Sequence, residues 1–233
     1  INLYKQGSPY ESKAESVKSG YFGAMKMTIL EEIIHSVQDN LHRLNIQAVM
    51  GVNTINEELA KTILELDDKI VTQLTEYLQL QLVPDEFQIA KKANLFFMLN
   101  PDNFITNVMG PDVMTYTHVE IDPKISELIP SLEEIYKRWL SPIQAQHAVF
   151  TTMEGMAEFV VQQILKDDVD FQNYLTTFVG TNYSDYSVKK STGKEFTQSI
   201  FDVYGKDTFS KLITNPPNTR ELKDPQLYLN RIK

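Results

Sequence analysis

A segment near the amino terminus combines a glutamate and a histidine at a spacing suited to metal binding. Glu31 and His35 lie four residues apart, so on a helix their side chains project side by side, while Glu32 stands about 100° around the helix axis. This is the spacing of H-E-x-x-H, in which both histidines bind zinc and the glutamate polarises the attacking water. Because Glu31 holds the position of the first histidine, the segment predicts one carboxylate and one imidazole ligand, with Glu32 as general base.

Two further carboxylates occur on a second predicted helix, within residues 152–160. Glu154 supplies a third ligand of the kind that a zinc site needs. Glu158 follows four residues later, so both side chains lie on the same helix face. We expect Glu158 to accept a hydrogen bond from His35 and so to hold that imidazole in its metal-binding tautomer.

The motifs E-E-I-I-H and E-G-M-A-E, far apart in the chain, resemble the glutamate zincins (gluzincins), metallopeptidases whose third zinc ligand is a glutamate on a second helix. The segment that begins with Pro216-Pro217 is also similar to the carboxyl-terminal segment of many bacterial H-E-x-x-H proteins. The matching positions there are Thr219, Leu222, Pro225, Tyr228 and Leu229. The chain departs from the pattern at Glu31 and Asp224, where those proteins carry histidine.

The resemblance implies a zincin-like, mainly helical domain that hydrolyses a peptide or protein substrate. It implies one divalent metal ion held by Glu31, His35 and Glu154, with Glu158 behind the ligands and Glu32 as the base. Zinc is the expected ion. Manganese and iron are the alternatives, because two carboxylates and one imidazole make a harder ligand set than two imidazoles and one carboxylate.

Two other functions fit the same residues. In the first, the chain is a metal-free, inactive relative of such peptidases that acts as a binding or structural protein, since Glu31 replaces a ligand. In the second, Glu32 and His35 form the E-x-x-H motif of a ferritin-like di-iron carboxylate protein. That site requires a second E-x-x-H, which the chain lacks.

Three side chains are candidates for lining a substrate groove. His147 precedes Glu154 by seven residues and lies close to it around the helix. His118 could donate a hydrogen bond to a bound substrate, and Tyr186 carries a hydroxyl that could stabilise an oxyanion. His42 is interpreted as an ordinary polar residue.

The periodicity of apolar residues predicts a mainly α-helical fold with at most a small β-sheet. Helices are predicted over residues 24–44, 54–78, 85–99, 122–140, 142–165, 195–204 and 206–213. A strand is predicted over residues 115–121, with residues 46–50 as its candidate partner. The chain is expected to form a single domain over residues 1–233, with an irregular arm at 1–19, a short helix and a long loop over residues 167–193, and a tail at 216–233.

Composition excludes several classes of function. The 233-residue chain has a formal net charge of −9 and no extended basic run, which argues against a nucleic-acid partner. It has no run of eighteen apolar residues, so no membrane span is expected. The absence of cysteine excludes thiolate ligands and a cysteine nucleophile. A cytoplasmic location is the default expectation, with a removed amino-terminal leader as the alternative.

Overall fold

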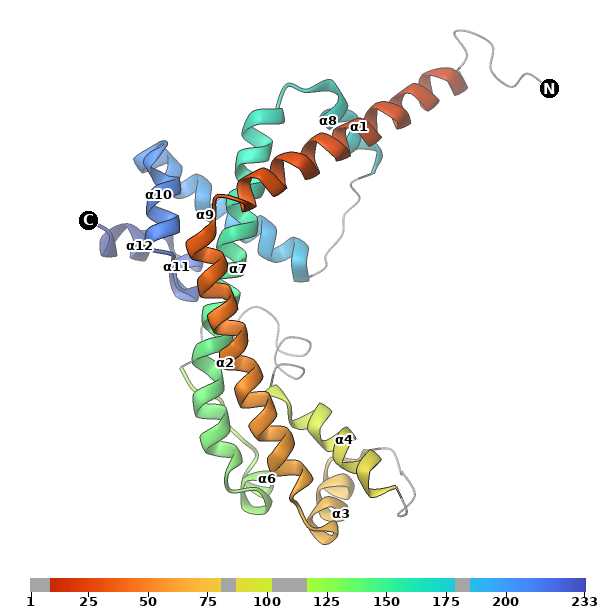
Figure 1. The fold of residues 1–233 in the computed structure, drawn as a ribbon, viewed down its shortest axis with the longest axis vertical. Helices are drawn as coiled ribbons and strands as arrows, with labels where there is room; N and C mark the ends of the chain where they lie inside the picture. The colour runs from red at the N-terminus through yellow and green to blue at the C-terminus, as the bar shows by residue number, and fades with distance from the viewer. Residues whose placement is uncertain (1–8, 81–86, 102–116, 179–184) are drawn as a thin grey trace, which may run out of the picture. The chain divides into compact units, whose positions relative to one another are not determined.

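The computed structural model describes residues 9–80, 87–101, 117–178 and 185–233 (Figure 1). The regular structure in these ranges is helical, which confirms the mainly α fold. The helices are α1 (Pro9–His35), α2 (Asp39–Leu64), α3 (Asp68–Tyr77), α4 (Gln88–Leu99), α6 (Pro123–Leu128), α7 (Leu132–Leu165), α8 (Val169–Thr177), α9 (Asp185–Tyr204), α10 (Asp207–Thr214), α11 (Thr219–Lys223) and α12 (Pro225–Arg231). No helix in the described part of the chain is long and apolar enough to cross a membrane.

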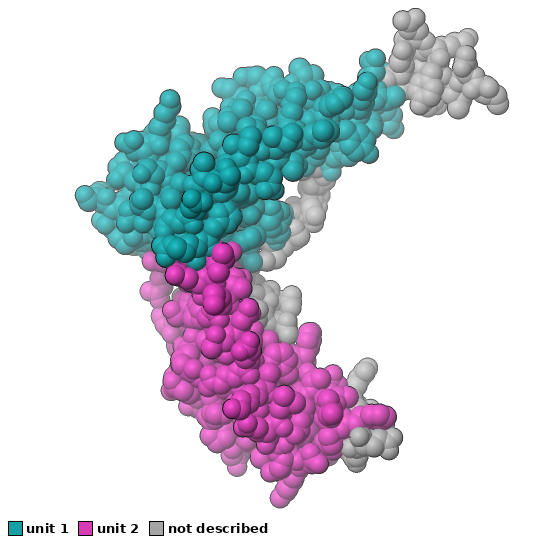
Figure 2. All heavy atoms as spheres, in the orientation of Figure 1, with its two compact units in different colours: residues 1–43, 148–217, 221–233 teal, residues 44–147, 218–220 magenta. Residues whose placement is uncertain are grey.

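The helices gather into two compact units (Figure 2). Unit 1 comprises residues 1–43, 148–217 and 221–233, and unit 2 comprises residues 44–147 and 218–220. Two of the boundaries between them fall inside helices α2 and α7, so no flexible linker marks them in the sequence. The prediction of a single domain therefore stays a prediction.

Unit 2 is built around one apolar cluster to which α2, α3, α4, α6 and α7 contribute. Its fully buried members include Leu59, Leu74, Leu95, Leu132 and Trp139. Leu59 lies on α2 and Leu74 on α3, which the sequence predicted as one helix over residues 54–78 and which residues 65–67 separate. Only part of the run at residues 95–99 is core, because Phe97 is 60% exposed.

The helix starts predicted at residues 54 and 142 are wrong, because both residues lie inside longer helices. Gly51 lies inside α2, and a Cβ atom placed on it would meet the Cβ of Pro142 at 3.1 Å, so this glycine allows close packing and does not end a helix. Thr54 is no N-cap, because its hydroxyl donates to the Met50 carbonyl at 2.9 Å, one turn back in the same helix. Pro142 lies inside α7 and does not begin a helix. The break falls at residues 129–131, around Pro130.

The predicted strand is not formed in its described part. Residues 117–121 have no regular structure, and residues 115 and 116 lie outside the described ranges. Its proposed partner, residues 46–50, is part of α2. An isolated strand cannot satisfy its backbone groups without a neighbour, and helix formation removes the only candidate. The next helix does begin at the predicted place, where Asp122 caps it by accepting from the Lys124 amide at 2.8 Å.

In unit 1, helix α1 is longer than predicted at its start and shorter at its end. Residues 9–19, predicted as an irregular arm, are helical. The predicted helix at 24–44 is interrupted at residues 36–38, where α1 ends and α2 follows. The interruption is held by side chains: the His42 ring bonds the last carbonyl of α1, that of His35, at 3.0 Å, and the Ser36 hydroxyl donates to the Ile33 carbonyl at 2.6 Å. Such side-chain bonds replace backbone bonds that would continue the helix.

Helix α8 packs along α1 and fixes its position in unit 1. Gly23 lies so close to the backbone of Asp170 that a Cβ atom there would overlap it. Lys26 forms ion pairs with Asp168 at 2.7 Å and Asp170 at 2.9 Å. The apolar contacts between the two helices gather around buried Phe171. These contacts with α8 fix the position of α1 within unit 1, and with it the carboxyl-terminal turns of α1.

The carboxyl-terminal part of the chain is more helical than predicted. Helix α9 begins at residue 185, inside the segment predicted as a long loop. The tail forms α11 and α12. Asp224, which departs from the histidine of similar proteins, caps α12 by accepting from the Gln226 amide at 3.1 Å.

Candidate metal centre

Three side chains from two helices of unit 1 converge as the motifs predicted. Glu31 and His35 come from the end of α1 and Glu154 from the middle of α7, and each offers one ligand atom within 4.8 Å of the others. His35 Nε2 lies 3.8 Å from Glu154 Oε1. All three side chains are largely withdrawn from solvent, with 13%, 16% and 11% of their surface exposed. The predicted convergence is confirmed, and the role of these residues as ligands stays a prediction.

Gln38 fixes the orientation and the tautomer of His35. Its amide nitrogen donates to the Met153 carbonyl at 3.1 Å, so its carbonyl oxygen is the atom that faces His35 Nδ1, at 2.8 Å. A carbonyl oxygen can only accept, and therefore Nδ1 carries the proton. In the neutral ring, Nε2 then has a free lone pair directed at the carboxylate of Glu154. Gln38 is fully buried, which keeps this arrangement rigid.

Glu158 contacts a lysine that the sequence analysis did not single out. Its Oε2 lies 3.4 Å from Lys190 Nζ, and its other oxygen accepts from the Gln162 amide. The partner predicted for Glu158 was His35, whose Nδ1 is instead held by Gln38. The difference arises because α1 ends at His35, so that Gln38 turns back toward the imidazole.

Lys190 on α9 joins two of the carboxylates. Its ammonium forms a close ion pair with Glu31 and a longer one with Glu158. Burial alone lowers the pKa of the Lys190 ammonium, but the hydrogen bond to Glu31 and the charges of both glutamates outweigh it and raise the pKa above its ordinary value. Lys190 is therefore a permanent positive charge at physiological pH.

Tyr186, predicted as a groove residue, contacts Glu154 directly. Its hydroxyl donates to Glu154 Oε2 at 2.6 Å. Burial and this hydrogen bond raise the pKa of Tyr186 to about 12, so the hydroxyl keeps its proton. As a result, the Oε2 atom of Glu154 is occupied by Tyr186 while its Oε1 atom faces His35.

Two glycines bring α9 close enough to α7 for these contacts. A Cβ atom on Gly155 would overlap the backbone of Gly193, and one on Gly193 would overlap the carbonyl of Thr151. Only glycine permits the two helix backbones to approach in this way. The glycine of E-G-M-A-E thus has a packing role next to the carboxylate that precedes it.

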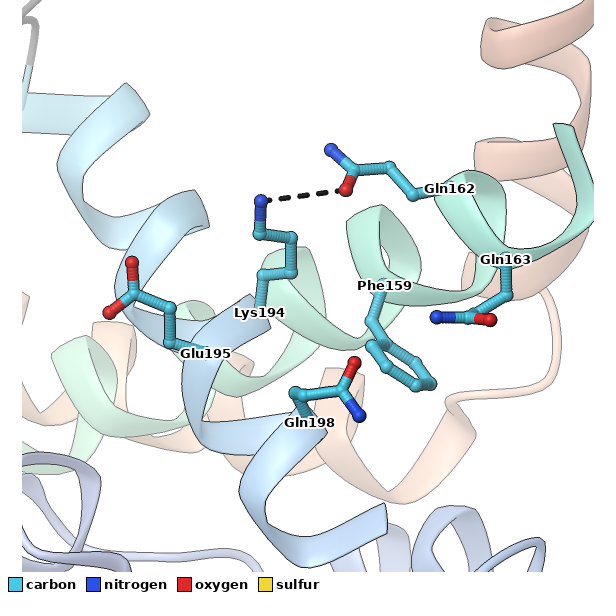
Figure 3. Close-up of a pocket in the computed structure, with 6 residues that line it drawn as sticks. All are labelled: Phe159, Gln162, Gln163, Lys194, Glu195 and Gln198. Atoms are coloured by element: carbon cyan, nitrogen blue, oxygen red, sulfur yellow. Dashed lines mark hydrogen bonds between the residues drawn. The ribbon is translucent and has the colours of Figure 1, made fainter. Parts of the chain in front are cut away.

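The hydrogen bonds continue from the candidate metal centre to an open pocket of about 300 Å³. Figure 3 shows Lys194 directed at Gln162, whose carbonyl oxygen lies 3.4 Å from the Lys194 ammonium. Gln162 also donates to Glu158, so it links the pocket to the buried carboxylates. The pocket is lined by Phe159, Gln162, Gln163, Lys194, Glu195 and Gln198.

The remaining predicted residues lie apart from this cluster or in the other unit. Glu32 is exposed on α1 and is not one of the three converging groups. His118 and His147 belong to unit 2, and His118 is exposed beside Glu120, so their place in a groove stays a prediction. His42 is more than a surface residue, since it holds the end of α1.

Sequence reasoning missed Gln38 and Lys190. Gln38 follows His35 by three residues, a spacing at which a side chain can fold back on a helix end, so it carried a signal. Lys190 carried none, because it lies in a polar segment predicted as a loop.

No family model, no curated protein and no solved structure matches this chain. The similarity to glutamate zincins therefore rests on the motifs of the sequence.

Proposed function

We propose that unit 1 binds one divalent metal ion through Glu31, His35 and Glu154, and that the protein is a metal-dependent hydrolase acting on peptide bonds. The observation that carries the proposal is the position of His35 Nε2, which faces Glu154 Oε1 at 3.8 Å, too far for a hydrogen bond, while Gln38 holds Nδ1. In the tautomer that Gln38 favours, Nε2 offers a lone pair to the space between them. A divalent ion bound there would accept it together with a lone pair of the carboxylate.

The candidate ligand atoms have the chemistry that a small divalent ion requires, and they lie within 4.8 Å of one another, somewhat wider than a bound zinc ion would hold them. Ligand atoms about 2.1 Å from a tetrahedral zinc ion lie about 3.4 Å from one another, and the His35 to Glu154 separation is 3.8 Å. Small rotamer changes would close the difference. Lys190 binds one oxygen of Glu31, and Tyr186 donates to one oxygen of Glu154. This favours binding of the metal through the other oxygen of each carboxylate.

The charge at the site also favours a cation. Within the described part of unit 1, the carboxylates of Glu31 and Glu158 share the ammonium of Lys190, while the carboxylate of Glu154 accepts from the neutral Tyr186 hydroxyl. A second buried carboxylate in the same unit is treated differently: Glu221 is bound by both ends of the Arg231 guanidinium, at 2.6 and 2.9 Å. Buried carboxylates require such compensation. Glu154 has no lysine or arginine partner among the described residues, so a metal ion would supply the positive charge that its buried carboxylate lacks.

A bound metal ion would polarise a water molecule for attack on a carbonyl carbon. In this proposal the Glu32 carboxylate, exposed beside Glu31, takes the proton of that water. The Tyr186 hydroxyl, which keeps its proton, donates to Glu154 Oε2 and would hold that carboxylate in place beside the metal ion. The role of Glu32 rests on the resemblance to the glutamate zincins.

A second candidate function is a metal-free binding protein with the same fold. The close ion pair of Lys190 with Glu31 favours it, because an internal ammonium can substitute for part of the charge of a metal. The di-iron alternative has no comparable support, since the sequence contains one E-x-x-H motif.

Metal analysis of protein purified without chelator, combined with anomalous diffraction at the zinc, manganese and iron edges, distinguishes these functions. We expect one ion per chain between Glu31, His35 and Glu154. The ion should be lost in Glu154→Gln and kept in the control Glu195→Gln, at an exposed glutamate on α9. No ion after soaking would support the metal-free function, and two ions would support the di-iron function.

If the metal is present, Glu32→Gln tests the hydrolase part of the proposal. The variant should keep its metal and lose peptidase turnover by a factor of about 10² to 10⁴, because only proton transfer is removed. Loss of the metal together with activity would make Glu32 a ligand and would contradict the assigned role.

A further inference from the structure

Lys190 has surroundings that differ from those of a surface ion pair. Only 15% of its side chain is exposed, and its partners Glu31 and Glu158 are exposed by 13% and 20%. Its ammonium also lies over the Tyr186 ring, 5.6 Å from the centroid. Burial costs a lysine side chain rotamer freedom and the hydration of its ammonium. Only strong anionic charge around the ammonium offsets these two costs.

These contacts place the ammonium against a residue of the proposed metal centre. Glu31 is a proposed ligand, and Glu158 lies on the same face of α7 as the proposed ligand Glu154. A divalent ion bound by Glu31 would share that carboxylate with the Lys190 ammonium. Two cations near one carboxylate repel each other, and at low effective dielectric this repulsion is large compared with the same pair in water.

We propose that Lys190 is a built-in cation that competes with the divalent metal ion for Glu31 and so sets the metal affinity of the site. This inference rests on the proposed metal binding by Glu31, His35 and Glu154. Without metal, Lys190 stabilises the folded protein by neutralising Glu31 and Glu158. With metal, Lys190 weakens the ligand that it shares. Glu31 and Lys190 thus act together to lower the affinity of the site for the metal ion and to make binding more readily reversible.

The experiment is a zinc and manganese titration of the parent protein, of Lys190→Met and of the control Lys194→Met. Lys194 is one turn further along α9, where its ammonium lies 3.4 Å from the carboxamide oxygen of Gln162, so it matches Lys190 in helix and residue type. We expect Lys190→Met to bind the ion about tenfold more tightly or better, the size of effect known for groups that contact metal ligands. Lys194→Met should bind as the parent does.

Thermal unfolding of the same proteins supplies the second readout. Without metal, Lys190→Met should unfold at a lower temperature than Lys194→Met, because its carboxylates have lost their counter-charge. Saturating zinc should raise the melting temperature of Lys190→Met by more than that of the parent. If Lys190→Met does not fold without metal, Lys190→Gln, which can still donate to Glu31 but carries no charge, replaces it in both measurements.

The outcomes separate the inference from the proposed function. If the parent binds metal and neither uncharged variant at position 190 binds it more tightly, the inference is overturned while the metal site stands. If neither the parent nor the variants bind metal, the proposed function fails and the inference falls with it.

Discussion

The two units differ in the kind of polar group that they bury. Unit 2 encloses an apolar cluster of leucines, isoleucines and valines around Trp139 and also buries Thr75, Lys91, Asn100 and Thr219. Unit 1 buries Gln38, Thr151, Thr152, Glu154, Thr197, Thr208 and Glu221 in addition to its apolar residues. Buried polar groups cost stability unless they are paired, and each one therefore needs a reason. The difference is that unit 1 buries two carboxylates, Glu154 and Glu221, whereas the described part of unit 2 buries none, and this is the contrast that the proposed metal site predicts.

A backbone collision in unit 1 should have the largest effect of the changes that test this contrast. Gly155→Ala forces a methyl group into the backbone of Gly193, so α9 must move away from α7. We expect a loss of more than about 3 kcal/mol in the free energy of unfolding, at the upper end of overpacking effects. The control is Gly205→Asn, at φ +56° with open space around it, where asparagine tolerates the backbone and the loss should stay below about 1 kcal/mol. Chemical denaturation measures both, and equal stabilities would show that α7 and α9 do not depend on this contact.

A cavity in unit 2 should cost stability without touching the site. Leu132 is fully buried in the apolar cluster, and Leu132→Ala should lower the free energy of unfolding by about 2 to 5 kcal/mol. Metal affinity of the folded variant should equal that of the parent. A change in affinity beyond the error of the titration would break the division of roles between the two units.

Removal of the Gln38 amide should affect the site more than the fold. Gln38→Leu leaves His35 Nδ1 without its acceptor, so the ring can adopt the other tautomer or rotate. We expect a 10- to 100-fold loss of metal affinity, typical of groups behind the ligands. Nitrogen chemical shifts of His35 in the metal-free protein report the tautomer independently of metal, with Gln163→Leu, at an exposed glutamine, as the control. Protonation of Nε2 in the metal-free parent would contradict the tautomer argued here.

The contact between α1 and α8 should give a smaller, pH-dependent effect. The hydrogen bond from Lys26 lowers the pKa of Asp168, and hydrogen bonds from Ser19 and then Lys26 lower the pKa of Asp170, from an ordinary value of 3.8. Groups with a lowered folded pKa stabilise the protein above that ordinary value, and the contribution is lost as the pH falls through the folded pKa. Lys26→Met should therefore be less stable than the parent at pH 7, and the difference should shrink below about pH 4. Denaturation at pH 7 and pH 3 measures it, and a difference that does not change with pH would contradict the cause given.

Periodicity and motif spacing were sufficient for the helical fold and for the convergence of Glu31, His35 and Glu154. These features depend on local repeats along a helix, which sequence displays directly. Helix ends were predicted less well, because Gly51 and Pro142 act through a contact between two helices and not through local turn formation. Lys190 was out of reach for a similar reason: its partners lie far away in the chain, and only the Gly155 and Gly193 contact brings its helix to them.

A zinc titration of the parent and of Glu31→His tests the central claim most directly. If Glu31, His35 and Glu154 form the site, the parent binds one zinc ion per chain. The histidine variant binds it more tightly, because imidazole suits zinc better than a second carboxylate and reaches the ion from the same helical position. His118→Ala, at an exposed histidine of unit 2, should bind as the parent does. Absence of saturable binding by the parent, or equal or weaker binding by Glu31→His, would contradict the account.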